Sequence, residues 1–171
     1  MARAARRDQE AFTTLVRRHQ AALVNFFRRM GDYSSAEDLA QETFIRLFRY
    51  RRKYRPTAKF TTFLYVLARR RWSDHCRALK RRKRAYAKVA EEAETQEPTR
   101  NDSADEAKAR VSAALAGLTE EMRTVVVMSV YQGFKYREIA DVTGIPLGTV
   151  KTRMFHALRR LKEALNDDED E

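Results

Sequence analysis

The sequence predicts an all-α protein of two small helical domains joined by a flexible linker. Only five Gly and three Pro occur among 171 residues, too little turn-forming material for a protein of many strands. Hydrophobic residues make up 43% of the chain, enough for packed cores, and they recur at the three- and four-residue spacing of amphipathic helices.

The first predicted helix covers residues 10–30 and ends at Gly31. A second helix follows Ser34 and Ser35, which precede two acidic residues in a capping-box arrangement. We expect this second helix to present one apolar face, formed by Leu39, Ala40, Phe44, Leu47 and Phe48.

Residues 50–62 contain Pro56 and many Lys, Arg and Thr, and they predict a loop. A third, long helix is predicted from Phe63 through Trp72 into the basic run 77–84, with one of the two preceding threonines as its N-cap.

Composition changes at about residue 87 to polar and acidic residues with little that can be buried. We therefore expect a first domain at 1–86, a linker at 87–110 and a second domain at 111–171. In the second domain Thr119 is the expected N-cap of a helix that ends at Gly133.

Residues 136–161 have the spacing of a helix-turn-helix. A short helix ends at Gly144, which takes the positive φ of a tight turn, and Pro146 opens a second helix. The second helix is expected to bury Val150, Met154 and Leu158.

The outward residues of that helix are small or basic, and such side chains can reach base edges or phosphates in the major groove. A helical hairpin with a merely solvated basic face is the alternative. The glycine turn, short first helix and basic face together favour DNA binding. The candidate duplex-reading residues are Gly148, Thr149, Lys151, Thr152, Arg153, Phe155, His156 and Arg159.

The formal net charge is +11 and the pI about 10.1, so anionic polymers are the expected partners. Residues 1–84 carry +16, residues 85–111 carry −3 and residues 112–171 carry −2. The last part combines a basic segment with the acidic tail 167–171, which masks it in the total.

An enzyme is the class that the sequence disfavours. Three separate His, a lone Cys76 and no Gly-rich phosphate loop give no catalytic, metal or cofactor site. Apolar stretches are too short for a membrane span or a signal peptide, and a single Cys fits a reducing compartment, so we expect a cytoplasmic protein without membrane insertion.

Aromatic and cationic residues interleave along residues 49–84, a pattern that suits single-stranded nucleic acid. Rings stack on unpaired bases while cations follow the backbone. The alternative is that most rings are core, which we expect of Phe63. Tyr54 and Phe60, in or beside the predicted loop, are the better candidates for contacting DNA.

Four segments with the same order and spacing resemble the extracytoplasmic-function (ECF, group IV) sigma factors of the bacterial sigma-70 family; they are residues 38–48, 60–65, 68–77 and 144–153. The resemblance covers residues 8–165. Phe63 and Arg70 depart from the family pattern, where Trp and Asn are usual, which leaves the preferred bases of the minus-ten element open.

The resemblance implies binding to core RNA polymerase, at the clamp helices of the largest subunit and the flap of the second-largest, and sequestration by an anti-sigma factor. It implies polymerase contacts by Asp38, Gln41, Glu42, Arg46 and Leu47, with burial of Leu47 in its own domain as the alternative. It also implies single-stranded minus-ten contacts by Tyr54, Arg55, Lys59, Phe60, Thr61, Thr62, Arg69, Arg70 and Arg77, and duplex reading of the minus-thirty-five element by the last helix.

Two other functions are compatible with parts of the sequence. A dimeric helix-turn-helix regulator would bind an operator and never polymerase, and an RNA-binding bundle would show no preference for duplex promoters. Binding to core polymerase separates both from a sigma factor.

Overall fold

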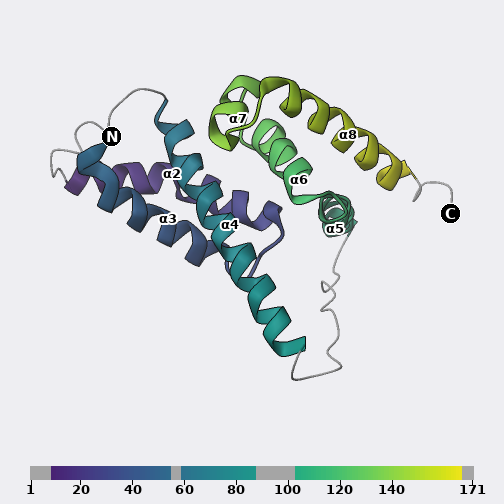
Figure 1. Ribbon diagram of the computed structural model, residues 1–171, viewed down its shortest axis with the longest axis horizontal. Helices are drawn as coiled ribbons and strands as arrows, with labels where there is room; N and C mark the ends of the chain where they lie inside the picture. Colours follow the sequence, from purple (N-terminus) through teal and green to yellow (C-terminus); the bar gives the residue numbers. More distant parts are fainter. Residues whose placement is uncertain (1–8, 55–58, 88–102, 167–171) are drawn as a thin grey trace.

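The computed structural model describes residues 9–54, 59–87 and 103–166, and every regular element among them is helical (Figure 1). Helices α2 to α4 form the first domain and helices α5 to α8 the second. The predicted all-α class and two-domain organisation are confirmed.

The first domain consists of α2 (Gln9–Met30), α3 (Ala36–Tyr50), the 3-10 turn η1 (Arg51–Lys53) and α4 (Phe60–Ala87). The third helix thus begins three residues before the predicted start at Phe63. Large apolar side chains from all three helices are fully buried together, which fixes their packing. They include Leu23, Phe27, Leu39, Leu47 and Leu64.

The turn between α2 and α3 depends on Asp32. The sequence predicted a serine capping box, but Ser35, the N-cap residue, makes no side-chain capping bond. Instead the Asp32 carboxylate accepts the Ser35 N–H at 2.7 Å, the Ser34 hydroxyl at 3.0 Å and His75 Nε2 at 2.6 Å. The carboxylate therefore ties this turn to α4.

Burial by itself would raise the pKa of Asp32, but the hydrogen bonds from Ser35, His75 and Ser34 outweigh it and hold the pKa below its ordinary value. A carboxyl group with a lowered folded-state pKa contributes stability above its unfolded pKa. That contribution disappears as the pH falls through the folded-state pKa.

We therefore expect Asp32→Asn to lower the free energy of unfolding by about 1 kcal/mol at pH 7. The difference from the parent should shrink as the pH falls below about 4, where the parent carboxyl group becomes protonated. Thermal unfolding at pH 7 and at pH 3 measures this, and an equal difference at both pH values would contradict it.

The second domain consists of α5 (Ser103–Ala116), α6 (Glu120–Val126), the π-helical turn η2 (Val127–Tyr131), α7 (Tyr136–Thr143) and α8 (Leu147–Asn166). As predicted, Thr119 caps α6, since its side chain accepts the Met122 N–H at 3.3 Å. Gly144 ends α7 with φ +71°, also as predicted.

The buried stripe of α8 differs from the predicted one. Val150 and Met154 are buried, but Leu158 is 51% exposed, and Ala157 takes the inward position with no exposed surface. Because α6 packs directly against α8, a small side chain fits where the two backbones approach.

The two domains pack against each other, and Arg123 of α6 lies at their junction. Its guanidinium donates to three carbonyl oxygens at and just after the end of α5 and to Met30 O at the end of α2, the last at 2.7 Å. Both helix C-termini carry partial negative charge, so a cation between them is favourable. Gly31, at φ +109°, leaves the space this needs, because a Cβ there would lie 2.6 Å from Arg123 Nη1.

A second set of contacts joins α4 to α7 and to residues 132–134 just before it; α4 and α7 lie side by side in Figure 1. The Tyr65 hydroxyl donates to Gln132 Oε1, and the Tyr65 ring meets Phe134 edge-on at 4.9 Å between centroids. Burial raises the pKa of Tyr65 well above its ordinary range, so this hydroxyl stays protonated as a donor. At the start of α4, Lys59 Nζ lies 2.7 Å from Glu138 Oε1.

Candidate nucleic-acid interface

The predicted single-strand contacts divide between surface and core. Lys59, Arg70 and Arg77 are exposed, and Arg69 is partly exposed. Thr62 is only 6% exposed and belongs to the core, so the structure contradicts it as a base contact. Thr62 lies on the inward side of α4, whereas its neighbour Thr61 on the same helix is partly exposed. Arg55 lies outside the described residues.

Three aromatic rings gather at the start of α4. Tyr54 lies 5.2 Å from Phe63 and 6.4 Å from Phe60, measured between ring centroids, and Phe60 also contacts His19 at 5.3 Å. Tyr54 and Phe60 are each partly exposed, as is the neighbouring Thr61. The cluster thus presents ring surface to solvent beside exposed cations, as stacking on unpaired bases requires.

The second helix of the helix-turn-helix presents the predicted outward residues. Lys151 and Thr152 are exposed, Phe155 is 65% exposed, and Thr149, Arg153 and His156 are partly exposed. Gly148 at the start of the helix is also exposed, and a Cβ there would meet no atom within 4 Å. Arg159 pairs with Glu163 at 3.6 Å on the same face.

The predicted polymerase contacts on α3 include both exposed and buried residues. Asp38, Gln41 and Glu42 are exposed, but Leu47 has no exposed surface, so it is core and the prediction that it contacts polymerase is wrong. Its position on the apolar stripe of α3 explains this. Glu42 pairs with Arg71, and Arg46 donates two N–H groups to Asp74 at 3.1 and 3.2 Å.

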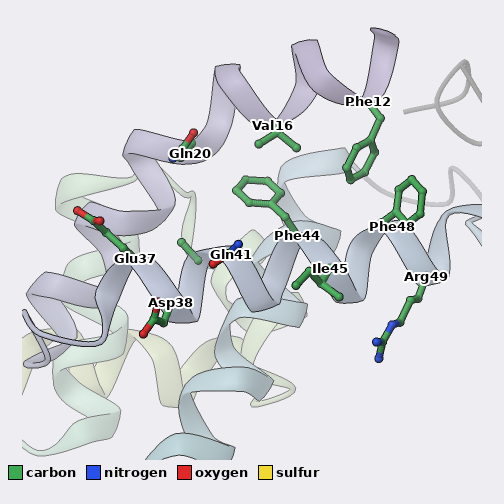
Figure 2. A pocket seen from close by; sticks show the side chains of 11 residues that line it. Phe12, Val16, Gln20, Glu37, Asp38, Gln41, Phe44, Ile45, Phe48 and Arg49 are labelled. Carbon is green, nitrogen blue, oxygen red and sulfur yellow. The ribbon is translucent and has the colours of Figure 1, made fainter. Parts of the chain in front are cut away.

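A groove of about 560 Å³ runs between α2 and α3 beside these residues (Figure 2). Its apolar wall includes Ile45 and Phe48, which are 44% and 41% exposed, and Asp38 and Gln41 line it as well. Phe12 meets Phe48 edge-on at 5.0 Å. Large apolar side chains left open to solvent beside polar ones are typical of a protein-binding surface.

Cys76 is partly buried, and burial raises the pKa of its thiol to about 11, so it is a poor nucleophile at neutral pH. Among the described residues, no three His, Cys, Asp or Glu side chains form a group that could hold a metal. No helix in the described parts has the length and apolar character of a membrane span.

Sequence reasoning missed the acidic partners of the predicted cations. Asp74 holds Arg46 and Arg77, and Glu138 holds Lys59. The pKa of Glu138 is lowered chiefly by the hydrogen bond from Lys59, helped by the Lys135 N–H. The spacing of Asp74 and Arg77 on one helix was the available signal for one pair, whereas Lys59 and Glu138 belong to different domains.

Two family models match the chain: one described as Sigma-70 region 2 covers residues 15–82, and one described as Sigma-70, region 4 covers residues 108–161. The chain is 32% identical to RNA polymerase sigma-H factor of Pseudomonas aeruginosa, over 95% of this chain and 90% of that protein. It is 31% identical to RNA polymerase sigma factor CarQ of Myxococcus xanthus, over 93% and 91%.

Solved structures have the same fold. CnrH, in complex with the cytosolic domain of CnrY, matches 98% of this chain and 95% of its own at TM-score 0.76 and 26% identity. The sigma factor RpoE from Bartonella quintana, in complex with the anti-sigma factor NepR, matches 92% and 98% at TM-score 0.77 and 23% identity. The chain is also 34% identical to ECF RNA polymerase sigma factor SigE of Mycolicibacterium smegmatis, over 92% of this chain and 64% of that protein. It therefore belongs to the ECF group of the sigma-70 family of RNA polymerase sigma factors.

Proposed function

We propose that this chain binds core RNA polymerase in the cytoplasm and directs it to promoters, without a catalytic site of its own. The observation that carries the proposal is the pairing of a basic, aromatic first domain with a basic helix-turn-helix in one sigma-70 chain. We assign residues 1–86 to polymerase and minus-ten binding and 111–171 to minus-thirty-five binding. Of the linker predicted at 87–110, residues 103–110 belong to α5, so the second domain begins earlier than the change in composition indicated.

Binding to polymerase is the test of this function. The exposed residues of α3 and the groove beside them supply the surface for the clamp helices, and the second domain would bind the flap. The full chain should form a stable complex with core polymerase and support transcripts from specific start sites. A dimeric operator-binding regulator would do neither.

Recognition of the minus-thirty-five element is proposed for the exposed face of α8. Lys151→Ala should weaken binding of holoenzyme to duplex promoter DNA by about tenfold, because one base or phosphate contact is worth 1–3 kcal/mol. Competition binding against a promoter with a scrambled upstream element measures this. Lys162→Ala, which removes the same charge farther along α8, is the matched control and should change selectivity little.

Melting of the minus-ten element is proposed for the ring cluster at the start of α4. Replacing Tyr54 and Phe60 together by Ala should reduce open-complex formation by about tenfold or more, since each stacked base is worth 1–3 kcal/mol. Permanganate reactivity of unpaired thymines measures this opening. Duplex binding by the same variant should stay near the parent value, and permanganate signals equal to the parent's would contradict the assignment.

We also propose that an anti-sigma protein binds this chain. Support comes from the two matched structures, one a sigma factor in complex with an anti-sigma factor and the other CnrH in complex with the cytosolic domain of CnrY, and from the packing of the two domains here. In this arrangement α7 packs against α4, and Glu138 pairs with Lys59, one of the proposed minus-ten cations. A partner that stabilised this packing would keep Lys59 paired with Glu138.

A further inference from the structure

Oppositely charged side chains link α3 to α4 in a ladder. Glu42 of α3 pairs with Arg71 of α4, and one turn farther along Arg46 pairs with Asp74. The order of the charges is reversed between the two pairs. Because Glu42 and Arg46 are four residues apart on α3, and the α4 partners three apart, both pairs lie on the facing sides of the helices. If α3 moved along α4 by one pair, Glu42 would face Asp74 or, in the opposite direction, Arg46 would face Arg71, so like charges would meet.

Asp74 connects these two pairs to Arg77, which lies nearer the C-terminus of α4. Its Oδ2 accepts both N–H groups from Arg46, and its Oδ1 accepts one from Arg77 at 2.6 Å. Hydrogen bonding by Arg77, followed by that of Arg46, keeps the pKa of Asp74 low despite partial burial, so the carboxylate is charged at neutral pH. One carboxylate thus holds two guanidinium groups from two helices.

Asp74 takes only some of the hydrogen-bond donors of each arginine. A guanidinium has five N–H donors in a rigid fork, and Arg46 gives two of them to Asp74 while Arg77 gives one. The side chains are 42% and 69% exposed, so both arginines remain accessible to a partner. An arginine already held in one orientation loses less conformational entropy when it binds a carboxylate or phosphate.

We infer that Asp74 is a positioning residue that orients Arg46 for the polymerase and Arg77 for the promoter strand. The inference rests on the proposed function, because Arg46 and Arg77 are its polymerase and minus-ten contacts. Through Asp74, the polymerase-facing helix α3 and the DNA-facing helix α4 share one set of hydrogen bonds. Asp74 itself touches neither partner.

The direction of the charge change separates positioning from simple electrostatics. Asp74→Asn makes this basic chain more positive by one charge, so loss of repulsion alone would strengthen its binding to anionic DNA. Positioning predicts the opposite, because both arginines lose their common acceptor. Asp141→Asn is the matched control, since it makes the same charge change at an exposed position on α7, away from both arginines.

The test measures the affinity of the full chain for core polymerase. Asp74→Asn and Arg46→Ala are each expected to weaken it by about fivefold, and the double variant should be no weaker than Arg46→Ala, since Asp74 acts through Arg46. Asp74→Glu should recover part of the loss. Thermal unfolding of each variant, compared with the parent, accounts for any general loss of structure.

A second measurement addresses Arg77. With enough chain to saturate the polymerase, Asp74→Asn and Arg77→Ala should show the same deficit in permanganate-detected opening, and combining them should add nothing. Parent-like polymerase affinity of Asp74→Asn, or additive losses with Arg46→Ala, would overturn the inference while the proposed function stood. Failure of the parent chain to bind polymerase would overturn both.

Discussion

Arg123→Ala is expected to lower the free energy of unfolding by about 3 kcal/mol, the largest effect we expect from a side chain that is not wholly buried. The guanidinium donates to four main-chain carbonyls, three from α5 and the loop after it and one from α2. Alanine would leave these carbonyl oxygens without their charged donor. The loss corresponds to roughly 6–12 °C in melting temperature for a chain of this size.

Trp72 makes this prediction specific to the domain junction. It is the single Trp of the chain and lies in the first domain, 6% exposed, so its fluorescence reports on that domain alone. In the parent, fluorescence and far-UV circular dichroism should unfold together if the packed domains form one cooperative unit. In Arg123→Ala the helical signal should begin to fall before the fluorescence changes.

Two controls define the role of the guanidinium. Arg137→Ala removes the same charge from an exposed position on α7 and should change stability by no more than about 0.5 kcal/mol. Arg123→Lys keeps the charge but has fewer donors and should lie between parent and alanine. Coincident transitions in Arg123→Ala would show that this side chain does not couple the domains.

Local chemistry made several features predictable from sequence. Gly144 at a helix end and Thr119 at a helix start act through their own backbone or nearest N–H groups, and both behave as predicted. The helix over residues 136–143 also has the predicted bounds. These features depend on neighbours within four residues, which a sequence displays directly.

Features set by neighbours distant in sequence were not predictable in the same way. Thr62 lies on a helix with exposed and buried sides, and which side faces inward depends on how α4 meets its neighbours. Leu47 was the opposite case, because the apolar face of α3 already contained it and only its proposed polymerase contact was wrong. Ser35 lost its expected capping role because Asp32, held by His75 from α4, supplies the acceptor. Arg123 stands before an apolar run with no local sign that two helix ends converge on it.

In the candidate site too, some features follow from local sequence and others from tertiary contacts. Exposure of Lys151, Thr152 and Phe155 followed from the helical period of α8, because the inward positions Val150 and Met154 define the opposite side. The pairing of Lys59 with Glu138 joins different domains and required the tertiary structure. Whether a cation is available to DNA therefore depends on domain packing as well as on its place in a motif.

The helix that carries the duplex-reading residues packs against α5, α6 and α7, and Met154 is buried on its inward side. Met154→Ala should lower the free energy of unfolding by about 2–4 kcal/mol, because Met154 is 4% exposed and its removal leaves a cavity. Leu158→Ala removes a similar volume one turn farther along but should cost under about 1 kcal/mol, since Leu158 is 51% exposed.

Urea unfolding followed by circular dichroism measures both variants, with Trp72 fluorescence reporting separately on the first domain. Met154→Ala should also weaken duplex minus-thirty-five binding. Lys151 and Phe155 lie on the same turns of α8, and their positions depend on how that helix packs through Met154. If Leu158→Ala proved the more damaging change, the inward face of α8 would be the one expected from leucine periodicity, and Lys151 would no longer point away from the core. Leu158 and Lys151 lie seven residues apart on the same side of α8, so the assignment of the DNA-reading face requires that Leu158 be exposed.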